Sequence, residues 1–141
     1  MNAGQQPTSN PTVLIVDDDP ESLLLVSTMV EYIGYHPVTA ISFDAALTLL
    51  QGQPAAVVLD LVMPEDASVR LLAEMCRTDN ATPVVLMSAA RKDELGAIAI
   101  EHVRLGINVV STLAKPFWVD VLVTALEKAI PSLPDAVVGA Q

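Results

Sequence analysis

The chain has little cysteine, few aromatic residues and little positive charge. Its 141 residues include one cysteine, Cys76, which excludes an internal disulfide and agrees with a reducing compartment. Aromatic residues make up 4% and hydrophobic residues 52%, so the core must be aliphatic. Seven basic residues stand against 17 acidic ones. The resulting net charge of −10 disfavours binding to nucleic acid or to an anionic membrane surface.

Long hydrophobic runs are also missing. No apolar stretch is long enough to span a bilayer. The polar N-terminus lacks the basic start and the apolar middle of a signal peptide. We therefore expect a cytoplasmic protein without membrane contact.

The length suits one domain, and both ends of the chain are rich in residues that break regular structure. Each end contains two prolines and a glycine within a short stretch. We expect a flexible N-terminal segment at 1–11, a folded domain at 12–130, and a tail or the start of a linker at 131–141.

Between these ends, short β-branched apolar runs alternate with segments of helical periodicity. The first helix is clearly delimited, because Asp19 can cap it and Gly34 can close it. The predicted strands span 12–16, 35–40, 55–59, 82–87 and 108–113, and the predicted helices span 20–33, 42–51, 67–77, 92–105 and 116–130. Five βα units with near-continuous apolar strands predict an α/β fold. It would be a doubly wound, five-stranded parallel sheet within a three-layer sandwich.

Polar residues follow these apolar runs at the predicted strand ends. They are Asp17, Asp18 and Asp19 after the first strand, Asp60 after the third, Ser88 after the fourth and Lys115 after the fifth. Each residue alone is ordinary, since such residues often cap helices or face solvent. Together they lie along the edge of the sheet where ligands bind in this architecture.

This combination suits phosphoryl transfer. Carboxylates hold Mg²⁺, and a further carboxylate can act as a nucleophile that forms an acyl phosphate. A lysine and a hydroxyl can bind the phosphoryl oxygens. Asp60 is the best candidate nucleophile, because it stands alone at the tip of a central strand.

Four segments resemble the receiver domain of two-component response regulators, in the right order and on the predicted strands. They are VLIVDDDP at 13–20, VVLDLVMP at 57–64, VVLMSA at 84–89 and LAKPF at 113–117. The resemblance extends over about 12–130. It implies a flavodoxin-like sandwich that signals rather than acts as an enzyme, catalysing only its own phosphorylation and slow dephosphorylation.

The resemblance also implies residue roles. Asp60 would be the phosphoacceptor, and Mg²⁺ would be held by Asp17, Asp18, Asp60 and the backbone carbonyl of Val62. Ser88 and Lys115 would bind the phosphoryl group, and the Lys115–Pro116 bond would be cis. The phosphoryl donor would be a sensor histidine kinase or a histidine phosphotransfer protein. A downstream protein would receive the signal, and a homodimer is conceivable.

Three departures from the family pattern stand out. Thr112 occupies the switch position that is usually aromatic, which leaves no ring to follow Ser88. The segment 65–68 replaces a usual glycine with two carboxylates and small residues, and the helix at 92–105 is extended. Val62 and Ala90 cannot orient an attacking water, which predicts slow loss of the phosphoryl group.

Other readings remain open at this point. Without an output domain after residue 130, the chain is expected to act alone, by docking or by phosphotransfer; in a cut chain the tail would begin a linker. A degenerate receiver could serve as an unphosphorylated scaffold. A haloacid dehalogenase-type phosphatase would use Asp17 as nucleophile, although that reading leaves Asp60 unexplained.

Overall fold

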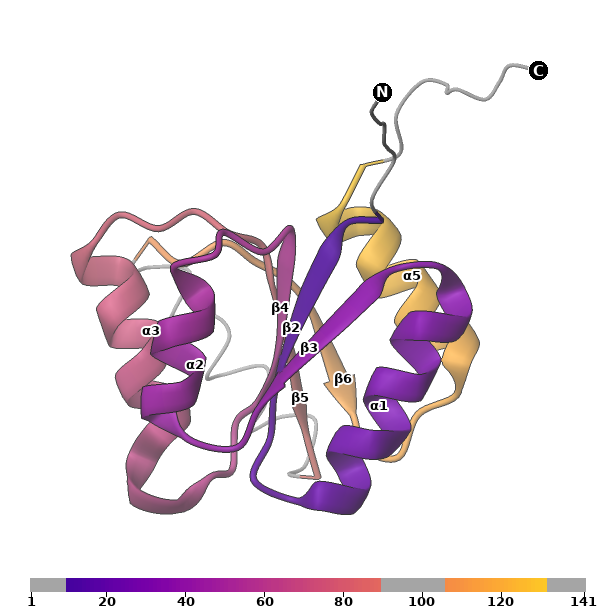
Figure 1. Cartoon of the computed structure of the whole chain (residues 1–141), viewed down its shortest axis with the longest axis horizontal. Coiled ribbons are helices and arrows are strands. Elements are labelled where there is room, and N and C mark those ends of the chain that lie inside the picture. Colours follow the sequence, from indigo (N-terminus) through magenta and orange to yellow (C-terminus); the bar gives the residue numbers. More distant parts are fainter. Residues whose placement is uncertain (1–9, 90–105, 132–141) are drawn as a thin grey trace, which may run out of the picture.

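The chain folds as a three-layer α/β sandwich (Figure 1). The structure is a computed structural model and describes residues 10–89 and 106–131. Within these residues, five parallel strands form one sheet in the order β3-β2-β4-β5-β6. The strands are β2 (Thr12–Val16), β3 (His36–Ala40), β4 (Ala56–Asp60), β5 (Val84–Ser88) and β6 (Val109–Ala114). The predicted doubly wound parallel sheet is confirmed.

Two aliphatic cores flank the sheet, because successive side chains of a strand point to opposite faces. Leu14, Val57 and Leu59 pack on one face against α2 (Phe43–Leu50) and α3 (Ala67–Arg77). Ile15 and Val58 pack on the other face against α1 (Pro20–Ile33) and α5 (Val119–Ala129). Figure 1 shows these two helix pairs on opposite sides of the sheet. The central strands β4 and β5 are buried along their whole length, which fixes the positions of their C-terminal ends.

Local signals set the first helix as predicted. The Asp19 side chain accepts a hydrogen bond from the backbone N–H of Glu21, and Pro20 occupies the first turn. Gly34 closes the helix with a φ of 118°, a left-handed conformation that glycine adopts without a steric penalty.

The last helix begins later than predicted. Trp118 has an extended backbone, with φ of −85° and ψ of 160°, so α5 starts at Val119 rather than at Pro116. The Lys115–Pro116 bond is cis, which confirms that prediction. The predicted helix at 92–105 lies outside the described residues. No helix in the described part of the chain is long and apolar enough to cross a membrane.

Candidate functional site

The predicted site residues gather at the C-terminal edge of the sheet. Asp60 is the last residue of β4, and Asp17 and Lys115 directly follow β2 and β6. Asp17 is fully buried and Asp60 is 6% exposed, whereas Asp18 is exposed. Three strands that are distant in sequence thus bring two buried carboxylates and one ammonium group together.

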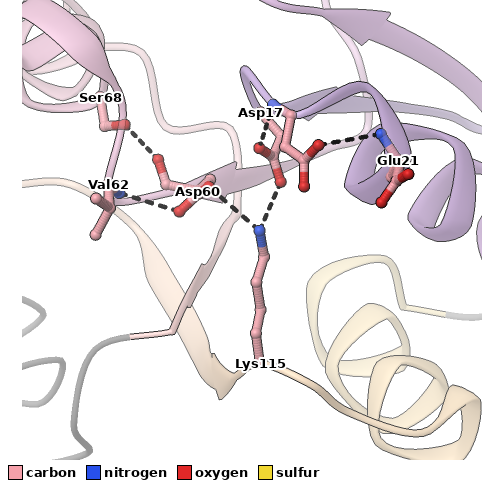
Figure 2. A network of polar contacts seen from close by, with 7 residues as sticks. Asp17, Glu21, Asp60, Val62, Ser68 and Lys115 are labelled. Atoms are coloured by element: carbon pink, nitrogen blue, oxygen red, sulfur yellow. Dashed lines mark hydrogen bonds and ion pairs between the residues drawn. The ribbon is translucent and has the colours of Figure 1, made fainter.

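Lys115 joins the two buried carboxylates. Its Nζ lies 2.6 Å from Asp17 Oδ2 and 3.2 Å from Asp60 Oδ2 (Figure 2). Two carboxylates this close repel each other in a buried setting unless a cation lies between them. The lysine supplies that cation in the structure as it stands.

Backbone N–H groups hold the remaining carboxylate oxygens. The N–H of Asp19 donates to Asp17 Oδ1 at 3.0 Å, and the N–H of Val62 donates to Asp60 Oδ1 at 3.0 Å. Both contacts come from the turn that immediately follows the strand. Each carboxylate is therefore fixed by its own loop on one side and by Lys115 on the other.

The surroundings shift the pKa values of Asp17, Asp60 and Lys115 in different directions. Burial disfavours the charged form of Asp17, but hydrogen bonds from Lys115 and Ser22 outweigh it, so the pKa of Asp17 is lowered. Burial dominates at Asp60, whose pKa is raised, and the charge of Asp17 adds to the effect. The pKa of Lys115 is raised because its two carboxylate partners outweigh its own burial.

The acidic group suits a hard cation. Carboxylate oxygens of Asp17, Asp18 and Asp60 lie within 4.8 Å of one another, and two of the three side chains are buried. Oxygen donors of this kind are what Mg²⁺ prefers, with water completing its coordination. The donor set therefore fits the metal that the sequence predicts.

Comparison with protein families identifies the domain. The family model for the response regulator receiver domain matches residues 13–127. The chain belongs to this family. Receiver domains are signalling modules that interact with histidine kinases, and they are not enzymes in the ordinary sense.

The chain is also similar in sequence to known regulatory proteins. The chain is 33% identical over 106 residues to the probable transcriptional regulator ycf27 of Guillardia theta, covering 74% of the chain and 39% of that relative. It is 32% identical over 119 residues to the regulatory protein AtoC of Escherichia coli, covering 84% of the chain and 25% of AtoC. The chain thus spans only about a quarter to two fifths of the length of these relatives.

Solved structures show the same receiver fold. A Francisella response regulator receiver domain is 27% identical, with a TM-score of 0.69 over 85% of this chain and 96% of that one. The chemotaxis protein CheY4 of Vibrio cholerae has a TM-score of 0.75 at 22% identity, over 86% of this chain and all of CheY4 (100%). TrrA of Thermotoga maritima, solved in complex with Mg²⁺ and BeF, has a TM-score of 0.70 at 23% identity, over 85% of this chain and 99% of TrrA.

The two predicted switch residues lie on β5 and β6, on what we call the switch side of the site. Ser88 is buried at the end of β5, and its carbonyl accepts a hydrogen bond of 2.8 Å from the N–H of Lys115. Thr112 pairs with Leu86 and is exposed on β6. Among the positions predicted to control dephosphorylation, Val62 is 64% exposed and Ala90 lies outside the described residues.

Sequence reasoning missed one contact in this receiver site. The Ser68 hydroxyl donates a hydrogen bond to the backbone carbonyl of Asp60, and Ser68 is only 1% exposed. A signal was present, because Ser68, Leu71, Leu72 and Met75 recur at helical spacing and form the buried face of α3. A serine on such an apolar stripe needs a hydrogen-bond partner when buried.

Proposed function

We propose that this receiver domain accepts a phosphoryl group on Asp60. The supporting observation is the pair of buried carboxylates, Asp17 and Asp60, bridged by Lys115 at the strand edge. Of the two, Asp60 has the raised pKa and ends a central strand, whereas Asp17 is held in its charged form. The end of a central strand places Asp60 in the middle of the sheet edge, where its carboxylate can act as the nucleophile.

The metal site of this proposal uses the acidic group. Asp17, Asp18 and Asp60 would hold Mg²⁺ together with the backbone carbonyl of Val62. Support comes from the closeness of the three carboxylates and from TrrA, a receiver-like structure that was solved with Mg²⁺ and BeF. When bound, Mg²⁺ supplies positive charge that offsets the charge of an incoming phosphoryl group.

The chemical step belongs to Asp60. One of its carboxylate oxygens attacks the phosphorus of a phosphohistidine, a P–O bond forms, and the P–N bond breaks. The imidazole leaves with the bonding electron pair and takes up a proton. The products are an acyl phosphate on Asp60 and a neutral histidine on the donor.

Two further side chains would bind the transferred group. The Lys115 side chain is 20% exposed, and its ammonium group lies 3.2 Å from Asp60 Oδ2, beside the carboxylate that would receive the phosphoryl group. We assign Lys115 to one phosphoryl oxygen and the hydroxyl of Ser88 to another. The Lys115 ammonium would then exchange a carboxylate partner for the phosphoryl group.

Membership of the receiver family indicates which kinds of protein would donate the phosphoryl group and receive the signal. We propose a sensor histidine kinase or a histidine phosphotransfer protein as donor and a downstream protein as target. The charge of −10 speaks against nucleic acid as a direct target of this chain. Action by docking or by onward phosphotransfer stays a prediction.

The proposal is tested by intact mass after incubation with Mg²⁺ and either acetyl phosphate, phosphoramidate or a phosphohistidine protein. We expect a single phosphoryl adduct on the unmodified protein and none on Asp60→Asn. Asp44→Asn, an exposed aspartate in the first turn of α2, is the matched control and should be labelled normally.

Two results would overturn the assignment. A label that persists in Asp60→Asn but disappears in Asp17→Asn would support the phosphatase-type nucleophile instead. No adduct from any of the three donors would leave an unphosphorylated scaffold as the better description.

A further inference from the structure

Ser68 ties the start of α3 to the end of β4. It is the second residue of α3, it is 1% exposed, and its hydroxyl donates to the backbone carbonyl of Asp60 (Figure 2). The two partners are eight positions apart in sequence, so this bond closes the whole loop after β4. The loop contains Val62, whose carbonyl is part of the proposed metal site.

The start of α3 has no side-chain cap at its N-cap position, although Met63 and Ala67 are buried in the core on either side of the turn. Asp66 is the N-cap of α3, but its side chain makes no capping hydrogen bond. Glu65 and Asp66 both have left-handed backbones, with φ of 58° and 55°, although neither is glycine. Such conformations persist only where the surrounding structure holds them in place. The Ser68 hydroxyl is a buried contact positioned to do this.

Asp60 is held at three points, and each controls a different part of the residue. The Val62 N–H holds Oδ1, the Lys115 ammonium holds Oδ2, and the Ser68 hydroxyl holds the main-chain oxygen. Phosphorylation would disturb the two side-chain contacts, since it occurs on the carboxylate itself. The Ser68 hydroxyl contacts only the backbone carbonyl of Asp60, so this hydrogen bond can persist through the reaction.

We propose that Ser68 is a positioning residue for phosphoryl transfer, an inference that rests on the proposed role of Asp60. Its hydroxyl fixes the backbone from which the Asp60 carboxylate and the Val62 carbonyl both extend. Small errors in the placement of reacting groups lower rates steeply, so loss of this contact should slow the chemical step. Ser68 does not touch the phosphoryl group.

The test compares Ser68→Ala, which deletes the hydroxyl, with Ser68→Thr, which retains it. Phosphorylation by acetyl phosphate is followed at saturating Mg²⁺, well below the melting temperature of every variant. We expect Ser68→Ala to react about tenfold more slowly than the unmodified protein and Ser68→Thr to recover most of the rate. Ser68→Cys keeps a side chain of similar volume with a weaker donor, and it is used if the alanine variant does not fold.

A control separates positioning from general destabilisation. Val30→Ala removes two methyl groups from a fully buried position on α1, near the opposite end of that helix from the site. It should lower the melting temperature at least as much as Ser68→Ala and leave the phosphorylation rate within about twofold.

Three outcomes separate the role of Ser68 from the proposed phosphorylation of Asp60. If the unmodified protein is labelled on Asp60 and Ser68→Ala reacts at the same rate, Ser68 only packs and the inference is wrong. If Val30→Ala slows the reaction equally, the effect is one of stability and the inference is again wrong. If the unmodified protein takes no label at all, the proposed function fails and the role of Ser68 fails with it.

Discussion

The strand edge has two halves that are built differently. On the acidic half, Asp17, Asp60 and Lys115 form a buried network in which each charged group has a defined partner. On the switch half, Ser88 is buried at the end of β5, whereas Thr112 is exposed on β6, an outer strand of the sheet. The first half is fixed by charge and burial, whereas Thr112 on the second half is neither charged nor buried.

This difference suggests that phosphorylation and its readout depend on separate parts of the site. Buried charges must be compensated, so most changes on the acidic half carry a large free-energy cost. An exposed threonine at a sheet edge imposes no comparable demand. The receiver domain therefore keeps its buried acidic network while Thr112 departs from the expected family pattern.

Removal of a negative charge from the acidic half should have the largest effect. Asp17→Asn should reduce Mg²⁺-dependent phosphorylation by about a hundredfold or more, because a buried ligand and the partner of Lys115 are lost together. Titration of the initial rate against Mg²⁺ measures the effect. Asp120→Asn, an exposed residue in the first turn of α5, should behave like the unmodified protein. Normal labelling of Asp17→Asn would show that the acidic half does not depend on its buried charges.

Removal of the cation should destabilise the metal-free protein. Lys115→Met leaves two buried carboxylates without their shared partner, and we expect a loss of about 3 kcal/mol in the free energy of unfolding at pH 7. Urea denaturation measures the loss, with exposed Lys128→Met as the control. Mg²⁺ should restore more stability to Lys115→Met than to the unmodified protein, since the ion can replace the missing charge. Equal stabilisation of both would argue against a shared site for the lysine and the metal.

The pH dependence of stability should show the opposed shifts of the two buried carboxylates. The lowered pKa of Asp17 contributes stability above its unfolded value of about 3.9, and this is lost as pH falls through the folded pKa. The raised pKa of Asp60 has the opposite sign, so its contribution is present at low pH and is lost as pH rises through the folded value.

Asp60→Asn should therefore be more stable than the unmodified protein at pH 7 without Mg²⁺, because the amide avoids the burial penalty that raises the pKa of Asp60. The difference should shrink as the pH falls through the pKa of Asp60, because the unmodified carboxyl then also becomes neutral. Denaturation at a series of pH values checks both statements. A destabilised Asp60→Asn at pH 7 would mean that Lys115 gains more from Asp60 than burial costs.

The sequence predicted the acidic half well because its signals are local. Each charged residue directly follows an apolar strand, and a parallel sheet aligns the strand ends, so Asp17, Asp60 and Lys115 could be placed together without coordinates. Ser68 was missed because its role depends on the path of an irregular loop. The left-handed backbones of Glu65 and Asp66 carry no glycine to indicate them.

Strand and helix limits were less predictable for a similar reason. The late start of α5 follows from the extended backbone of Trp118, which sits between a cis proline turn and the helix. Hydrophobic periodicity does not report that conformation, since Phe117 packs against the core although it precedes the helix. The start of α5 was consequently predicted three residues too early.

The smallest effect is expected on the switch half, where Thr112→Val replaces a hydroxyl with a methyl group of similar size. Because Thr112 is exposed, we expect a change in unfolding free energy of at most about 0.5 kcal/mol and a phosphorylation rate within about twofold. Thr112→Tyr, which introduces the missing ring, should leave the phosphorylation rate equally unaffected, since the acidic network forms without any contribution from this position. Parallel rate and denaturation measurements on both variants decide the point. A tenfold change in rate from either substitution would show that the two halves are energetically coupled, and the separation between chemistry and readout would then have to be abandoned.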